Sequence, residues 1–145
     1  MSSETITRND LTNILNEIGI GAIPFGTNHT FDLKNTNSTA ITVANTTPQS
    51  VFSISHTSRT GQVLVMARLY MQTSRYTSVG ALYVDSTSVD SAVTNSTTDK
   101  EVVLFRVVDV TKDSHTISLR LSTQDSGTTA TIPAYRAIAL LAVDL

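Results

Sequence analysis

The feature of this sequence that most constrains its fold is a long run in which apolar residues occupy every second position. The run covers residues 62–72, and the positions of its wholly apolar side are Val63, Val65, Ala67, Leu69 and Met71. Successive side chains of a β-strand point to opposite faces, so the run predicts a strand with one apolar and one mixed face. That combination is typical of a sheet in a two-layer sandwich.

Shorter segments of strand-like composition follow one another along the chain, separated by turn clusters of Asn, Ser, Thr and Gly. The predicted strands are residues 29–33, 39–44, 51–56, 62–72, 78–85, 101–110, 115–122, 128–132 and 134–143. Residues 86–99 are rich in hydroxyl side chains and are predicted to form a loop. Eight or nine strands at this spacing indicate an all-β sandwich or barrel.

The first 24 residues follow a different pattern. Thr7 is a predicted N-cap, with Asp10 three residues further on. Apolar residues then recur at helical spacing, and they are Leu11, Ile14, Leu15 and Ile18. Residues 8–18 are therefore predicted to form a short amphipathic helix, followed by a linker with glycines and Pro24. We expect residues 1–24 to be an assembly or attachment segment and residues 25–145 to be the head domain.

A helix of three turns is marginal on its own, so its apolar stripe needs a surface to pack on. The head domain, sister helices and a docking partner are the three alternatives.

The last predicted strand is apolar on both faces. One face carries Ala137, Ala139, Leu141 and Val143, and the other carries Ile138, Leu140 and Ala142. A sandwich covers only the inner face of each sheet, so the second face needs another cover. We expect Ile138, Leu140 and Ala142 to form a self-assembly surface against a neighbouring subunit, with a loop or the N-terminal helix as the alternative cover.

Composition excludes several classes of function. The formal net charge is −2, and the ten Lys and Arg residues are scattered singly, which argues against binding to nucleic acid or to an anionic membrane. The chain has no cysteine, so it forms neither disulfides nor thiolate metal sites. No apolar run is long enough to span a membrane, and the start of the chain does not resemble a signal peptide, so we expect synthesis in the cytoplasm.

Candidate catalytic groups are few and scattered. His29, His56 and His115 lack the spacing of a metal site, and most aspartates stand at predicted turns. We therefore predict that the protein is not an enzyme and uses neither metal nor cofactor. Arg75 and Tyr76, in a predicted polar loop, are a candidate ligand-contact pair. The alternative is that Tyr76 folds back over the edge of the sandwich.

The arrangement of the chain resembles that of small phage virion proteins of the head-fibre, tail-fibre or decoration type. The resemblance rests on the helix start Thr7-Arg8-Asn9-Asp10-Leu11, the Gly/Pro linker and the Thr/Ser-rich β head. The head is also similar to the jelly roll of the complement C1q/tumour-necrosis-factor type, whose last strand, here residues 135–143, lies near a trimer axis. The resemblance implies an antiparallel, jelly-roll-like β-sandwich, a homotrimer and outward-facing loops.

These observations lead to one main functional hypothesis and one alternative. The main hypothesis is a virion structural or adhesion protein that self-assembles, docks on capsid or tail proteins through its N-terminal helix, and contacts a host surface glycan or protein. The alternative is a monomeric carbohydrate- or protein-binding module that uses the same tyrosine-bearing loops.

Overall fold

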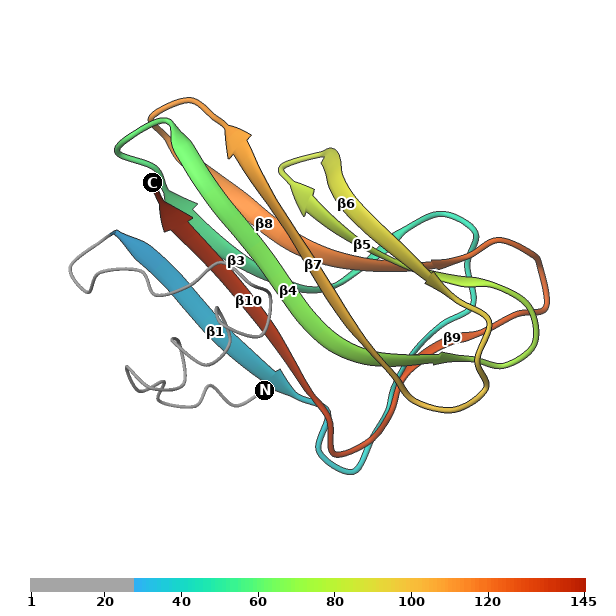
Figure 1. Ribbon diagram of the computed structural model, residues 1–145. Coiled ribbons are helices and arrows are strands. Elements are labelled where there is room, and N and C mark those ends of the chain that lie inside the picture. The colour runs from blue at the N-terminus through green and yellow to red at the C-terminus, as the bar shows by residue number, and fades with distance from the viewer. Residues whose placement is uncertain (1–27) are drawn as a thin grey trace.

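The computed structural model describes residues 28–145, which form two antiparallel β-sheets packed face to face (Figure 1). The expected all-β sandwich is therefore confirmed. Its strands are β1 (His29–Asn35), β2 (Ile41–Val43), β3 (Gln49–Thr57), β4 (Gln62–Thr73), β5 (Ser78–Val84), β6 (Thr87–Thr94), β7 (Lys100–Asp109), β8 (Ser114–Thr123), β9 (Ala130–Ile132) and β10 (Ala137–Asp144). The helix predicted at residues 8–18, including Leu11, Ile14, Leu15 and Ile18, and the boundary after residue 24 lie outside the described residues.

The two sheets have different strand orders. In the first sheet β1 pairs with β10, β10 with β4, and β4 with β7. The short strand β9 pairs with the far end of β4, and β2 pairs with β9. The second sheet has the order β3-β8-β5-β6. Strands distant in the sequence, such as β1 and β10, thus lie side by side (Figure 1).

Strand β6 corrects the prediction that residues 86–99 form a loop. Residues 87–94 pair with β5 across a two-residue turn at Asp85 and Ser86. Within the described chain, β6 is bonded to one neighbouring strand and lies at the edge of its sheet. Its side chains are mostly exposed or half-buried, so its sequence lacks the apolar alternation that marks a strand buried on one side.

The interior of the sandwich is built from the inward-facing residues of both sheets. Strand β4 contributes the five apolar residues that its alternation predicted, and all are buried. The second sheet contributes Phe52 and Ile54 of β3 and Leu119 and Leu121 of β8. This close-packed interior makes each sheet a rigid support for the side chains on its outer side.

The two faces of β10 are the reverse of the expected assignment. Leu140 is directly opposite Ala67 of β4, and residues opposite each other in an antiparallel pair point to the same face. Ile138, Leu140 and Ala142 therefore lie in the interior core rather than on a self-assembly surface. Because both faces of this strand are apolar, alternation alone could not determine which one points inward.

Candidate functional site

The outer side of the first sheet carries three side-chain rows that run across its four main strands. The middle row consists of Phe31, Leu141, Met66 and Phe105, each directly opposite the next. The flanking rows consist of His29, Val143, Leu64 and Val107, and of Leu33, Ala139, Arg68 and Val103. All of these residues except His29 and Arg68 are apolar, and none belongs to the interior core. We call these ten apolar residues the outer apolar face.

Strand β1 is oriented so that Thr30 and Lys34 point toward the second sheet. Thr30 contacts His56 of β3. The Nζ of Lys34 donates to the carbonyl oxygen of Val51, also in β3, at 2.8 Å. Phe31 and Leu33 consequently point to the outer side. A strand that turns its apolar residues away from the sandwich interior is expected where the sheet is covered on both sides.

Exposure varies across the outer apolar face. Leu64, Met66 and Leu141, at its centre, are each at most 1% exposed. At the β7 edge, Phe105 is 43% and Val107 is 49% exposed. The centre of the face is therefore buried within the single chain, and the accessible part is its β7 edge, where an exposed aromatic residue is a feature of protein contact sites.

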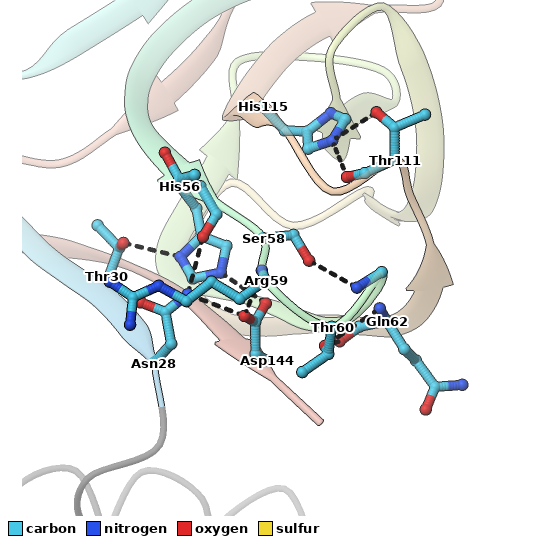
Figure 2. Close-up of polar contacts among 12 residues, drawn as sticks. Asn28, Thr30, His56, Ser58, Arg59, Thr60, Gln62, Thr111, His115 and Asp144 are labelled. Carbon is cyan, nitrogen blue, oxygen red and sulfur yellow. Dashed lines mark hydrogen bonds and ion pairs between the residues drawn. The ribbon is translucent and has the colours of Figure 1, made fainter.

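A buried polar network joins both ends of the head domain to the second sheet. Figure 2 shows His56 between Thr30 and Asp144: its Nδ1 lies 2.9 Å from Thr30 Oγ1, and its Nε2 lies 3.1 Å from Asp144 Oδ1. The other carboxylate oxygen of Asp144 accepts from Asn28 Nδ2 at 2.8 Å and from the backbone N–H of Arg59 at 2.7 Å. The start of β1, the end of β10 and the loop after β3 are thereby connected.

The hydroxyl, imidazole and carboxylate of this network have the composition of a catalytic relay. The Asp144 carboxylate can only accept, so Nε2 of His56 donates to it, and the Thr30 hydroxyl is the partner of Nδ1. His56 and Asp144 are both buried, and the three cavities described below are lined by other residues. We therefore interpret the network as a structural contact that holds the two sheets together. The absence of enzymatic activity stays a prediction.

The charge of Asp144 is stabilised by its hydrogen bonds. Burial by itself would raise the pKa of Asp144, because it penalises the charged form. Hydrogen bonds from the Asn28 side chain, the Arg59 backbone, His56 and Ser58 outweigh burial and hold the pKa of this carboxyl well below its usual range. The network therefore contains a carboxylate, not a carboxylic acid, at neutral pH.

A second histidine–aspartate pair lies at a cavity between β6 and β7. Nδ1 of His115 is 2.8 Å from Asp85 Oδ2, and its Nε2 is 2.8 Å from the Thr111 carbonyl oxygen. Both partners are acceptors, so the pair favours the imidazolium. The hydrogen bond to Asp85, followed by that to Thr111, raises the pKa of His115, and the same contact lowers the pKa of Asp85. The cavity, about 620 Å³, is also lined by Arg106 and Asp109.

A further cavity of about 590 Å³ lies along the same two strands, lined in part by Thr94 of β6 and Val102 of β7. Both cavities follow the open side of the sandwich, where the edge strands of the two sheets face each other. The Asp90 carboxylate spans this opening by accepting from the Phe105 backbone N–H at 3.0 Å. This contact partly closes the free edge of β7.

A smaller pocket lies on the outer side of the first sheet, where β1, β4 and β10 meet the loop before β10. We call it the tyrosine pocket. Its volume is about 280 Å³, and it is lined by Leu33, Arg68, Tyr70, Tyr135, Arg136, Ala137 and Ala139. The Arg136 guanidinium lies 4.3 Å from the centre of the Tyr70 ring. Glu101 Oε2 accepts from Arg68 at 3.2 Å and from Tyr70 Oη at 3.0 Å, and these contacts, the one with Arg68 first, lower the pKa of Glu101.

The predicted ligand-contact pair, Arg75 and Tyr76, lies between β4 and β5. The guanidinium carbon of Arg75 is 4.7 Å from the centre of the Tyr76 ring, and both side chains are exposed. Ser74 fixes this loop to Thr129 by two hydrogen bonds, of 3.0 and 2.8 Å. The pair is accessible, and its role in ligand contact stays a prediction.

Among residues 28–145 there is no helix with the length and apolar character that crossing a membrane requires. The same part of the chain contains no cluster of three or more histidine, aspartate or glutamate side chains arranged to hold a metal ion.

Sequence reasoning missed the polar network and the tyrosine pocket. One signal for the network was available, because Asp144 is a charged residue at the end of an otherwise apolar strand, and a buried charge requires a partner. Its partners, Asn28 and His56, are too distant in the sequence to be identified by spacing. The pocket brings together residues of β1, β4 and β10 and of the loop before β10, and no spacing rule connects these segments.

No protein-family model matches this sequence, and a comparison with curated proteins also gives no match.

Proposed function

We propose that this protein is a non-enzymatic structural or adhesion protein of a virion, and that copies of it assemble as a trimer through the outer apolar face. The observation that carries the proposal is the accessible edge of the apolar rows on the side of the first sheet that faces away from the core. The centre of these rows is already buried within one chain, whereas their β7 edge is exposed and calls for a cover. Phe105 and Val107 extend that surface to an exposed edge.

The strand order supports a jelly roll as the finer description of the fold. With the short strands β2 and β9 left aside, eight strands remain. In chain order, the first sheet contains strands 1-8-3-6 and the second contains strands 2-7-4-5. Two interleaved Greek keys of this kind make a jelly roll, an architecture common in viral capsid and lectin domains. The last strand, β10, then lies inside the first sheet and presents Ala139, Leu141 and Val143 to the outer side.

The point at which the N-terminal segment joins the head lies beside the same face. Asn28 is held beside Asp144, at the edge of the outer apolar face, by its side chain and by its carbonyl oxygen, which accepts from the Asp144 N–H at 2.9 Å. A segment that leaves the head at this point can bring the stripe of Leu11, Ile14, Leu15 and Ile18 onto the face. The same stripe is the proposed docking element for a capsid or tail protein.

The virion assignment rests on the arrangement of the sequence: a predicted short helix with an N-cap, a Gly/Pro linker and a Thr/Ser-rich β head. In this proposal the protein is made in the host cytoplasm and becomes part of the particle. Its loops, including the one with Arg75 and Tyr76, face outward toward a host surface glycan or protein.

The assembly proposal is tested by the solution mass of the full chain with charges placed on the exposed edge of the face. Phe105→Lys combined with Val107→Lys should convert a trimer to monomers, because burying two ammonium groups at a contact is costly. Val93→Lys is the matched control, since Val93 is 58% exposed on β6 of the other sheet. A double variant that keeps the trimer mass, measured by light scattering, would contradict an interface at this edge.

A further inference from the structure

The tyrosine pocket contains a tyrosine that is both strained and exposed. Tyr135 has a φ of 61°, in the left-handed region of the backbone that residues other than glycine rarely adopt. It is also 80% exposed, so its ring gains little from burial. Strain of this kind is concentrated at binding and catalytic sites, where the surrounding structure enforces it.

The backbone around Tyr135 is held firmly in this conformation. Its N–H donates to the Asn37 carbonyl oxygen at 2.6 Å. Buried Thr36 fixes the next residue, because its Oγ1 accepts from the Arg136 N–H at 2.9 Å and its N–H donates to the Arg136 carbonyl oxygen at 3.0 Å. An aromatic ring mounted on a fixed backbone loses little conformational freedom when it binds a ligand.

The groups beside Tyr135 combine apolar surface with polar side chains of both signs. The pocket holds the Tyr70 ring and the guanidinium groups of Arg68 and Arg136. Glu101 pairs with Arg68, and Asp99 pairs with Arg136 at 3.2 Å, so the two positive charges are balanced by two negative ones. This balance argues against a phosphate or another anionic ligand and favours a neutral one.

We propose that the tyrosine pocket binds one ring of a neutral glycan. A pyranose ring has an apolar face of C–H groups, which suits a tyrosine ring, and an edge of hydroxyls that both donate and accept hydrogen bonds. Arginine supplies the donors and the carboxylates supply the acceptors. The volume of about 280 Å³ lies just below the range of drug-sized sites, about 300–1,000 Å³, and suits a single ring. The pocket shares Leu33 and Ala139 with the outer apolar face, so the proposal requires that assembly uses the Phe105 and Val107 edge and leaves this end of the face open.

The test uses the full chain and three simple probes: the methyl β-glycosides of glucose, galactose and N-acetylglucosamine. We expect saturation-transfer NMR at millimolar glycoside to show contact with the ring protons of at least one of them. Tyr135→Ala should abolish that signal. Tyr83→Ala is the matched control, because Tyr83 is also stacked by an arginine, Arg120 at 4.1 Å, but lies in the second sheet. This control should keep the signal.

Three outcomes would overturn the proposal. The first is the absence of transfer to any of the three glycosides. The second is a signal that persists in Tyr135→Ala but disappears in Tyr76→Ala, which would place the sugar at the loop between β4 and β5. The third is a change in the solution mass of Tyr135→Ala, which would make Tyr135 a contact between copies of the chain.

A second variant keeps the test independent of folding defects. Tyr135→Gly relieves the left-handed strain, so its melting temperature should rise by about 3 °C while glycoside contact is lost. A variant that is more stable and does not bind cannot have lost binding by unfolding. If the Tyr135→Gly protein keeps glycoside contact, the Tyr135 ring does not take part in binding.

Discussion

Asn28 and Asp144, the first described residue and the second-last residue of the chain, are joined by a 2.8 Å hydrogen bond from Nδ2 to Oδ2. A second bond runs from the Asp144 N–H to the Asn28 carbonyl oxygen. The point at which the N-terminal segment joins the head is thus fixed beside the end of the central strand β10. Because His56 of β3 contacts the same carboxylate, this junction is also tied to the second sheet.

Removing the Asp144 carboxylate should destabilise the head domain. Asp144→Ala leaves the Arg59 N–H and the buried His56 ring without their acceptor, and we expect a loss of about 3 kcal/mol in the free energy of unfolding. Urea denaturation followed by circular dichroism measures this loss. Asp125→Ala removes an exposed carboxylate of the β8–β9 turn and should change stability by less than about 0.5 kcal/mol. Equal effects of the two changes would show that the network contributes nothing to stability.

The same carboxylate should make stability fall in acid. The pKa of Asp144 is lower in the folded chain than its ordinary value of 3.8, so its contribution is fully present above that value and is lost as pH falls through the folded-state pKa. The unfolding free energy of Asp144→Asn should therefore decline less steeply than that of the wild type below about pH 4.

The His115–Asp85 pair should have the opposite pH dependence. The pKa of His115 is raised above 6.5 in the folded chain, so its contribution is present below that value and is lost as pH rises through the folded-state pKa. Between about pH 5.5 and pH 8.5, the wild type should lose about 0.5 kcal/mol relative to His115→Gln, a small effect because Asp85 is exposed to screening water. Parallel stability profiles of the two proteins would contradict the assignment.

Two adjacent leucines of β10 should respond differently to truncation. Leu140 lies in the interior core, and Leu141 lies on the outer apolar face, yet both are fully buried. Each substitution by Ala should cost about 3 kcal/mol. The effect of Leu141→Ala should depend on protein concentration, because Leu141 lies in the row that ends at the exposed Phe105 and supports that contact edge, whereas the effect of Leu140→Ala should depend on it much less. Denaturation at two concentrations distinguishes these results, and identical concentration dependence would argue against assembly over this face.

The N-terminal stripe should contribute to assembly through its apolar side only. Ile14→Asp combined with Leu15→Asp places two charges in the stripe and should lower the solution mass. Asn13→Asp combined with Asn16→Asp adds the same charge to the opposite side of the predicted helix and should leave the mass unchanged. If both pairs of changes have the same effect on the mass, the loss follows from added charge and not from the stripe.

The sequence was sufficient to predict the sandwich wherever one face of a strand is apolar and the other is not. The alternation in β4 placed Val65, Ala67 and Leu69 correctly in the interior. In β10 both Leu140 and Leu141 are apolar, so the pattern contained no information about direction, and the pairing of Leu140 with Ala67 determines it. Strand β6 was missed because an edge strand with two accessible sides can have an almost wholly polar sequence.

The candidate sites were less predictable, because they depend on contacts between distant segments. Tyr135 could be named as an exposed aromatic residue, but its positive φ follows from the contact of its loop with Asn37, almost a hundred residues away. The outer apolar face likewise depends on the register in which the strands of the first sheet pair. Phe31, Met66 and Phe105 belong to three strands, and only their pairing aligns them in one row.

The solution mass of the full chain, measured by light scattering coupled to size exclusion, tests the central claim most directly. Assembly over the outer apolar face predicts three times the mass of one chain, and a mass that does not decline on dilution to micromolar concentration. A mass of one chain at every concentration would contradict the account, because the exposed apolar edge at Phe105 and Val107 would then remain in water without a second copy to cover it.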